Sequence, residues 1–324
     1  MPHAIRFHRT GGPEVLQWET VDVPSPAQGE ARVRQHAVGL NYIDTYHRTG
    51  LYPAPLPSGI GLEAAGVVEA VGEGVDDLAP GDRVAYAGGP LGAYAELRNV
   101  PADRLVKLPD PVSFEQGAAM MLQGLTAQYL LRRTYRVQPG DTILIHAAAG
   151  GVGLIVCQSA KALGATVIGT VGSDEKAALA RAHGCDHPIV YTRENFAERV
   201  REITGGEGLP VVYDSIGKDT FMESLGCLRP LGMMVLFGAA SGPVPPFDLG
   251  LLAKMGSLFI TRPTLFTYSA RRADLLAMAA DLFEVVVSGK VRIEVNQRFA
   301  LKDAAQAHRE LEARRTTGSS ILLP

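Results

Sequence analysis

The sequence predicts an α/β protein of two domains, the second built on a doubly wound parallel sheet. From about residue 124, short apolar segments alternate with helical ones, as they do in such sheets. The residues before that point are rich in Gly and Pro and in short strand-like segments, which is typical of a compact, mostly β domain. A chain of 324 residues, 46% of them hydrophobic, is long enough to bury two cores.

Each domain has its own series of predicted elements. In the first, strands are expected at residues 31–38, 64–71 and 83–87. In the second, strands are expected at 142–146, 166–170, 189–191, 211–214 and 233–237, with helices at 174–183, 194–203 and 220–228. After residue 263 the pattern predicts a helix at 270–288, a strand at 291–295 and a helix at 301–314.

Residues 140–153 contain the most informative motif: an apolar strand, a turn of small residues and the start of a helix that continues through 154–163. Ala148 takes the place of the first glycine in the usual pattern, which gives A-x-G-x-x-G with Gly150 and Gly153. The flanking strand and helix favour a dinucleotide site over a merely close-packed turn, because a pyrophosphate can approach bare backbone and lie against free N–H groups there. The predicted contacts are Ala149, Gly150, Gly151 and Val152.

The same segment resembles the signature of the quinone oxidoreductase and zeta-crystallin family, a zinc-free branch of the medium-chain dehydrogenases/reductases. The likeness covers almost the whole chain and is greatest to bacterial NADPH:quinone reductases. It is carried by Gly140, Asp141, Leu144, Ala148, Ala149, Gly150, Gly151, Gly153, Gln158 and Lys161, by residues 11–16 and 41–44, and by Gly318, Ser319 and Ser320. The resemblance implies a GroES-like catalytic domain at 1–123, completed by 264–324, and a Rossmann domain at 124–263. It also implies a homodimer formed through the nucleotide-binding domain. The apolar segment 257–260 is the candidate edge strand for pairing, and the alternative is an internal strand covered by its own chain.

Composition limits the possible partners and compartment. A formal net charge of −3 argues against a surface that binds nucleic acid, and no apolar stretch is long enough to cross a membrane. The N-terminal residues show no signal-peptide pattern, so a cytoplasmic location is expected. Cys157, Cys185 and Cys227 are too widely spaced for a disulfide framework, and Cys157 is expected in the core.

No metal site is expected. The positions that match the catalytic zinc ligands of zinc-dependent relatives are Asn41, Leu62 and Glu63, and residues 1–156 contain no cysteine. The histidines there lack ligand spacing, and His146, at the end of a strand, is expected to pack or to bond locally. Without a metal Lewis acid, the chemistry suits an acceptor that is already electrophilic.

The second strand of the sheet predicts NADPH as the cofactor. NAD-specific folds place an acid at its end to hold the ribose 2′-hydroxyl, whereas Thr170 and Val171 stand there in this chain. Gly172 and Ser173 leave a neutral surface, and the first acids open the next helix, where they complement its dipole. The resemblance implies that Lys176, Tyr191 and Arg314 surround the 2′-phosphate.

For the reacting end, the resemblance implies that residues 41–46 lie beside the nicotinamide and its ribose. Asn41 is a candidate donor to a ribose or quinone oxygen, and its alternative role is to form a turn. Asp44 of the same loop is expected either to orient hydroxyls or to cap the segment that follows the loop. Tyr46 and Tyr52 are candidates for stacking on a flat ring or for the rim of the core. Arg262 steadies a developing quinol oxyanion or contacts the cofactor phosphates. The catalytic candidates are thus Asn41, Tyr46, Tyr52 and Arg262.

The later strand ends supply further candidate cofactor contacts, because cofactors bind outside the carboxyl ends of parallel strands. The complete predicted set beyond the glycine loop is Asn41, Tyr42, Ile43, Asp44, Thr45, Tyr129, Gly172, Ser173, Lys176, Tyr191, Ile216, Phe237, Gly238, Ala239, Ser241, Arg262, Pro263 and Arg314.

Three functions are compatible with these residues. The leading one is metal-free, NADPH-dependent reduction of quinones by hydride transfer. An NADPH-dependent reductase of alkenal or enone double bonds would use the same fold and cofactor. A non-catalytic NADPH- or RNA-binding, crystallin-like protein is the third, although RNA binding predicts a basic stripe with aromatics and the Arg pairs of this chain are short and scattered.

Overall fold

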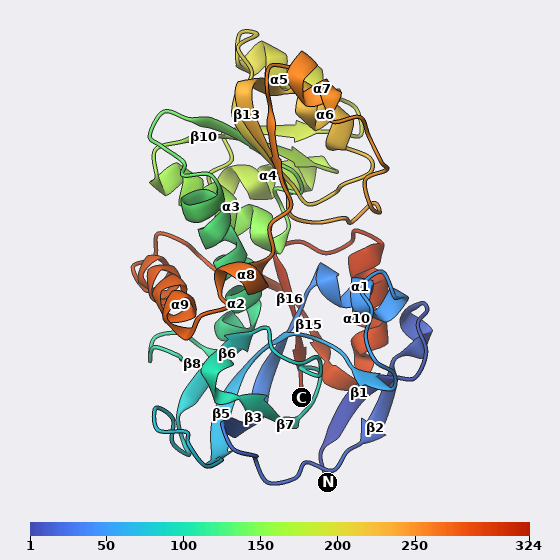
Figure 1. Cartoon of the computed structure of the whole chain (residues 1–324), viewed down its shortest axis with the longest axis vertical. Helices are drawn as coiled ribbons and strands as arrows, with labels where there is room; N and C mark the ends of the chain where they lie inside the picture. The colour runs from blue at the N-terminus through green and yellow to red at the C-terminus, as the bar shows by residue number, and fades with distance from the viewer. The chain divides into compact units, whose positions relative to one another are not determined.

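The computed structural model describes residues 1–324, which form two compact units (Figure 1). Unit 1 comprises Met1–Leu125, Ser269–Val287 and Ile293–Pro324, and unit 2 comprises Thr126–Tyr268 and Ser288–Arg292. The predicted domain boundary between residues 123 and 124 falls inside one continuous helix, α2 (Phe114–Tyr129), which a short π-helix at Leu130–Thr134 extends.

Unit 1 is built on two sheets. A three-stranded antiparallel sheet has the order β2 (Gln17–Thr20), β1 (His3–Phe7) and β4 (Ser58–Gly59). The larger sheet has the order β15-β16-β3-β5-β6-β8, and β7 also pairs with β3. Its strands are β3 (Glu30–Leu40), β5 (Glu63–Val71), β6 (Arg83–Ala87), β7 (Leu97–Pro101), β8 (Val106–Lys107), β15 (Val295–Ala300) and β16 (Ser319–Leu323). Because β16 pairs antiparallel with β3, the last residues of the chain return to the first unit.

Unit 1 buries its core between these sheets and a few helices. Phe7, Val33, Tyr86, Leu105 and Leu322 belong to one cluster with almost no exposed surface. The helices are α1 (Tyr42–Thr49), most of α2, α9 (Arg272–Val287) and α10 (Ala304–Glu312), with short 3₁₀ turns at Pro13–Val15, Ala102–Arg104 and Leu301–Asp303.

Unit 2 contains the predicted doubly wound parallel sheet. All neighbouring strands are parallel, in the order β11-β10-β9-β12-β13-β14. The strands are β9 (Thr142–Ile145), β10 (Thr166–Val171), β11 (His187–Val190), β12 (Leu209–Asp214), β13 (Leu228–Leu236) and β14 (Phe259–Thr261). The helices are α3 (Gly151–Ala162), α4 (Asp174–Ala182), α5 (Phe196–Ile203), α6 (Phe221–Gly226), α7 (Gly250–Lys254) and α8 (Leu265–Tyr268). The strands are apolar because helices cover them, and β12 is buried along its whole length.

Three sequence predictions of secondary structure were wrong. Residues 42–46 form the start of helix α1 rather than a loop. Residue 228 begins β13 instead of ending a helix. The strand predicted at 291–295 begins only at Val295, because the Gln158 side chain bonds both the N–H and the C=O of Arg292 (2.8 and 3.0 Å) in place of a neighbouring strand.

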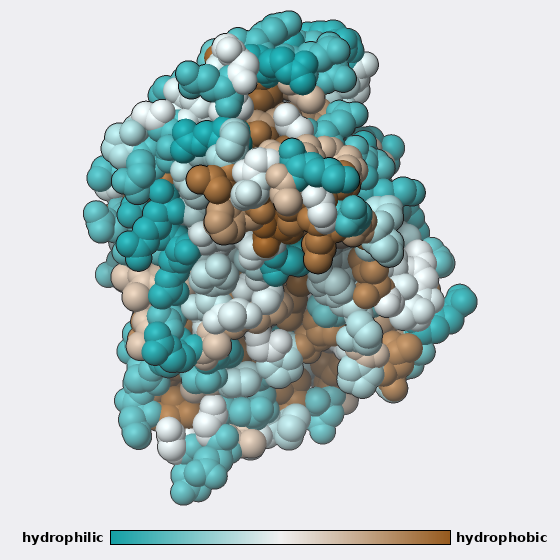
Figure 2. Space-filling model, turned by 45° about the horizontal axis from the view of Figure 1, so that its top comes forward, coloured by the Kyte–Doolittle hydropathy of each residue, from teal (hydrophilic) through white to brown (hydrophobic).

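Most of the visible surface is hydrophilic, with apolar atoms gathered on part of the face shown in Figure 2. Leu231, Leu249 and Phe259 are among the large apolar side chains that unit 2 exposes. None of the helices combines the length and the apolar character needed to cross a membrane.

Candidate functional site

The glycine loop of unit 2 joins β9 to α3 by a turn that excludes side chains. Ala147 adopts a left-handed backbone (φ 55°), and Gly150 is the N-cap residue of α3. At Gly153 a Cβ would lie 2.3 Å from the Ala147 carbonyl oxygen, so only glycine fits. The first N–H groups of α3 have no partner within the helix, which makes this turn suited to an anion.

The alanine at the first motif position is accommodated by the neighbouring strand. Ala148 is fully buried, and a Cβ at Gly169 of β10 would lie 2.5 Å from the Ala148 methyl group. The space for the Ala148 methyl group is therefore provided by a glycine on β10, and not by a glycine in the loop. At the end of β9, His146 bonds Thr170 Oγ1 (2.8 Å) and Ser224 Oγ (2.9 Å), and burial lowers its pKa. His146 thus bonds locally, as its position predicts, and neutral imidazole suits this site.

No acidic residue stands at the end of β10. Thr170 and Val171 are buried, and the Ser173 hydroxyl caps α4 by accepting from the Lys176 N–H (3.3 Å). The Tyr191 hydroxyl lies over Gly172, 3.1 Å from the position a Cβ would take there. Four predicted residues, Gly172, Ser173, Lys176 and Tyr191, are therefore brought together.

The first acid of α4 is occupied by a neighbouring arginine. Both carboxylate oxygens of Asp174 accept from the Arg193 guanidinium, at 2.6 and 2.7 Å. This bidentate contact holds the pKa of Asp174 below its ordinary value. The third residue predicted around a 2′-phosphate, Arg314, belongs to unit 1, where its charge acts on Tyr42.

A buried carboxylate organises the turn after β12, and the Ser241 hydroxyl and backbone hydrogen bonds join that turn to the one after β13. Asp214 accepts from the N–H groups of Ile216 (2.6 Å) and Gly217 (3.0 Å) and from the Thr220 hydroxyl (2.7 Å). The Ser241 hydroxyl donates to the Ile216 carbonyl (2.9 Å). At Gly238 a Cβ would lie 2.5 Å from the Ser215 carbonyl. The predicted residues Ile216, Phe237, Gly238, Ala239 and Ser241 therefore gather at the carboxyl edge of the sheet.

Near the start and the end of unit 2 in the sequence, two tyrosines and an arginine come together. The rings of Tyr129 and Tyr268 are stacked, with centroids 4.5 Å apart and planes 9° apart. Burial raises the pKa of Tyr129 and the nearby charge of Arg262 opposes that rise. Arg262 also donates to the carbonyl of Pro263 (3.4 Å). Tyr129, Arg262 and Pro263 are among the residues predicted from the sequence, and Tyr268 is not.

In unit 1, α1 begins with a capping box that buries a carboxylate. Asn41 is the N-cap residue, and Asp44 Oδ2 accepts from the Asn41 N–H (2.9 Å) and from the Tyr94 hydroxyl (2.9 Å). Asp44 is fully buried, and burial raises its pKa to about 7. Capping, one of its two predicted roles, is thus what the structure assigns to it.

Of the aromatic candidates, Tyr46 lies on α1, and Tyr52 follows just after the end of that helix. Tyr46 packs edge-to-face against Tyr42 (5.6 Å between centroids) and against Tyr52 (5.1 Å). The Thr45 hydroxyl donates to the Tyr42 carbonyl (2.7 Å), and Ile43 is half-buried. Tyr46 is 7% exposed, so it is largely a packing residue, whereas Tyr42 and Tyr52 are half-buried.

The structure adds a buried polar cluster that sequence reasoning missed, apart from Asn41. Asn41 Nδ2 lies 2.6 Å from Glu63 Oε2, and Asn41 Oδ1 lies 3.1 Å from Gln123 Nε2. Burial raises the pKa of Glu63 to about 8. The only signal was that Asn41 and Glu63 match positions at the zinc site of zinc-dependent relatives. Their amide and carboxyl bond to each other here, and nowhere do three His, Cys, Asp or Glu side chains gather so that they could hold a metal ion.

A second missed cluster anchors α1 to α10. Arg48 is 1% exposed and donates to Glu312 (2.6 and 3.0 Å), and its Nη1 lies 2.9 Å from His308 Nδ1. His308 Nε2 in turn lies 3.1 Å from the Tyr94 hydroxyl. Burial lowers the pKa of His308 to about 3, so the ring is neutral. No local pattern could reveal this cluster, because its members are up to 264 residues apart.

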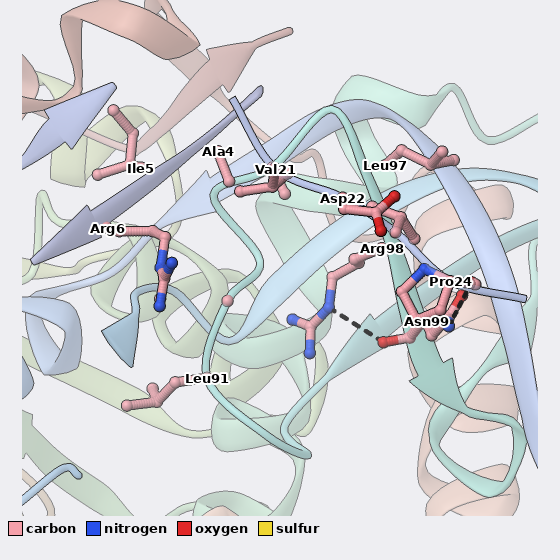
Figure 3. A pocket seen from close by; sticks show the side chains of 14 residues that line it. Ala4, Ile5, Arg6, Val21, Asp22, Pro24, Leu91, Leu97, Arg98 and Asn99 are labelled. Carbon is pink, nitrogen blue, oxygen red and sulfur yellow. Dashed lines mark hydrogen bonds between the residues drawn. The ribbon is translucent and has the colours of Figure 1, made fainter. Parts of the chain in front are cut away.

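One groove in unit 1 lies apart from all these residues. It has a volume of about 260 Å³, and residues of β1, β7 and the segment after β2 line it, with Arg6, Asp22, Arg98 and Asn99 as its polar side chains (Figure 3). None of the predicted site residues borders it. The groove therefore does not mark the predicted chemistry.

Comparison with known proteins places these features in a family. The chain matches the family model described as zinc-binding dehydrogenase over residues 151–282 and the alcohol dehydrogenase GroES-like domain over residues 27–110. It is 58% identical to a quinone oxidoreductase of Pseudomonas aeruginosa, over 100% of both chains. It is 49% identical to a 2-haloacrylate reductase of a Burkholderia species, over 100% of this chain and 99% of the relative.

A solved structure agrees with this comparison. The crystal structure of Escherichia coli quinone oxidoreductase complexed with NADPH matches with a TM-score of 0.98 and 51% identity, over 99% of this chain and 100% of that one. The fold predicted from the sequence, a GroES-like domain with a Rossmann domain, is thereby confirmed. On this evidence the chain belongs to the quinone oxidoreductase family of the medium-chain dehydrogenases/reductases.

Proposed function

We propose that this protein reduces quinones by transfer of a hydride from NADPH. The observation that carries the proposal is identity of 51–58% over the full chain with bacterial quinone oxidoreductases, one of them solved with NADPH. One hydride and one proton convert a quinone to its hydroquinone and leave NADP⁺. NADPH supplies the hydride when it is bound, and the residues of this chain bind and orient it.

The geometry of unit 2 supports the preference for NADPH. Binding of the pyrophosphate is assigned to Ala149, Gly150, Gly151 and Val152, since the turn has no room for side chains and the helix start attracts anions. The end of β10 offers a hydroxyl and a lysine one helical turn apart, where an NAD-specific fold would present a free carboxylate. The Asp174 carboxylate is already paired with Arg193.

The catalytic assignments are part of the proposal. Asn41 supplies a hydrogen bond to a ribose or acceptor oxygen, Tyr46 and Tyr52 form an apolar aromatic wall, and Arg262 steadies charge that develops on the acceptor. We assign the catalytic role to residues 1–123 with 264–324 and nucleotide binding to 124–263. Positioning and electrostatics carry the catalysis, and the proton comes from water or a ribose hydroxyl.

A reductase of activated carbon–carbon double bonds is the second candidate. The 49% identity to a 2-haloacrylate reductase specifically favours it, because that substrate class is also a conjugated acceptor. Steady-state oxidation of NADPH against quinones, enones, 2-haloacrylates and aldehydes separates the two. A higher kcat/KM for quinones supports the leading proposal. A higher kcat/KM for the double-bond substrates would instead show that the protein is a reductase of activated double bonds.

We further propose a cytoplasmic homodimer that forms through β14. This strand is the outer strand of the six-stranded sheet, so one of its edges has no partner within the chain. Its first residue, Phe259, is 55% exposed. An edge strand that presents an apolar side chain favours pairing across a two-fold axis.

A further inference from the structure

Four buried side chains of unit 1 form one hydrogen-bonded chain. Glu63 begins β5, Asn41 precedes α1, Gln123 lies on α2 and Ser319 begins β16. The links are Glu63 to Asn41 (2.6 Å), Asn41 to Gln123 (3.1 Å) and Gln123 to Ser319 (2.6 Å). None of the four is more than 7% exposed, so their hydrogen bonds to one another are shielded from bulk solvent.

The Ser319 hydroxyl determines in which direction this chain of hydrogen bonds runs. It has one proton but faces two oxygens, Gln123 Oε1 (2.6 Å) and the Ala119 carbonyl (3.0 Å), so one oxygen pair has no proton between its members. The two ends of an amide have the same shape. Turning the Gln123 amide by 180° lets its NH₂ donate to Ser319 Oγ, while the hydroxyl donates to Ala119.

This reversal passes along the chain to Glu63. Gln123 then presents its oxygen to Asn41, so Asn41 must present its NH₂ to Gln123 and its oxygen to Glu63. Two oxygens now meet 2.6 Å apart, and the pair is satisfied only if Glu63 Oε2 carries a proton and donates it. The other carboxyl oxygen, Oε1, accepts from the Leu122 N–H (2.7 Å), as the carbonyl oxygen of a neutral acid does.

The surroundings of Glu63 agree with a neutral carboxyl group. The titratable groups that act on it or feel its charge are Asp44 of α1, Tyr86 of β6 and Tyr94, and no cation is among them. An ionised Glu63 would therefore lack a counter-charge in a fully buried site. Burial is the largest influence and raises the pKa of Glu63, whereas hydrogen bonds with Asn41, Leu122 and Met121 oppose that rise without cancelling it.

We infer that Glu63 is a positioning residue: as a neutral acid it fixes the Asn41 amide with the oxygen towards Glu63 and the NH₂ towards Gln123. The inference rests on the proposed function for its catalytic meaning. In this orientation the second N–H of Asn41 remains to donate to an oxygen of cofactor or acceptor. Ionisation of Glu63 reverses the chain and exchanges the donor and acceptor ends of Asn41.

Infrared difference spectroscopy tests the proton itself without any turnover. Wild-type protein at pH 6 should show the carbonyl stretch of a protonated carboxylic acid that Glu63→Gln abolishes. Asp44→Asn should retain that band, which separates the two buried acids. Absence of a band specific to Glu63 would overturn the inference even if the protein is a fully active quinone reductase.

The pH profile tests the positioning role. For wild type, kcat/KM with a quinone should fall as the pH rises through about 8, mainly through KM, because Asn41 loses its donor orientation. In Glu63→Gln the amide NH₂ takes the place of the acid proton and does not titrate. The alkaline limb of the profile, which is the fall of kcat/KM above about pH 8, should therefore disappear. An unchanged alkaline limb in this variant contradicts the role, whereas a wild type that turns over no quinone refutes the proposed function and leaves the infrared result standing.

A matched pair of serines tests the far end of the chain. Ser319→Ala removes the final acceptor and should raise KM about tenfold, the ratio expected for about one unmade buried hydrogen bond. Ser320→Ala is the control, because that neighbour is equally buried but bonds to Gln297 (2.9 Å) outside the chain. Equal effects of the two substitutions would contradict the inference.

Discussion

The buried acid Glu63 makes the stability of this protein depend on pH in an unusual direction. Its pKa is raised by burial from 4.5 to about 8, so the folded state keeps a proton that the unfolded state loses. Its contribution to stability is fully present below pH 4.5 and declines as the pH rises towards 8. The substitution Glu63→Gln has no proton to lose and removes this decline.

The magnitude follows from the shift. Each pKa unit corresponds to about 1.36 kcal/mol, so between pH 5 and pH 7 the wild type should lose up to about 2.7 kcal/mol that Glu63→Gln keeps. The comparison of two pH values cancels packing differences between Glu and Gln, since these are the same at both. We therefore expect the free energy of unfolding of the variant, relative to wild type, to rise by about 2.5 kcal/mol over this interval.

Equilibrium unfolding in urea at pH 5 and pH 7 measures this difference. Fluorescence of Trp18, the single tryptophan, reports on unit 1, and circular dichroism reports on the whole chain. Glu115→Gln is the control for the lost charge, because Glu115 lies on the surface and pairs with Arg298 (2.7 Å). If the difference between Glu63→Gln and wild type is the same at both pH values, Glu63 is ionised in the folded protein and the reasoning is wrong.

Four further predictions concern the cofactor, the acceptor, metals and assembly. Lys176→Ala should weaken binding of NADPH by about 1.5–3 kcal/mol and leave NADH nearly unchanged, by calorimetry; equal losses for both would remove Lys176 from the phosphate site. Arg262→Ala should lower kcat/KM for quinone far more than it lowers NADPH affinity, whereas weak NADPH binding with normal turnover at saturation would make it a cofactor clamp. Quinone reduction should survive exhaustive chelation, because residues 1–156 hold no cysteine, and stoichiometric zinc whose removal abolishes activity would refute this. Light scattering should show a dimer that Phe259→Glu dissociates, and a wild-type monomer at micromolar concentration would contradict the β14 interface.

The sequence by itself determined the features that depend on short-range pattern. Alternation of apolar and helical segments was enough to predict the parallel sheet of unit 2, because strands covered on both faces are continuously apolar. Spacing of small residues identified the turn before α3, since the absence of a Cβ there is a local steric requirement. The missing acid after β10 likewise needed no tertiary information.

Only the tertiary structure decided which polar side chains meet. The Glu63–Asn41–Gln123–Ser319 chain joins residues up to 196 positions apart at a single link, and the Arg48–Glu312 pair spans 264. No local pattern encodes such meetings, because they arise when β16 and α10 return to the first unit. The same physics corrected α1: a buried capping box with Asp44 and Tyr94 stabilises a helix where turn-forming residues had favoured a loop. Burial, which exists only in the folded chain, then determines that Glu63 is a neutral acid rather than a charge.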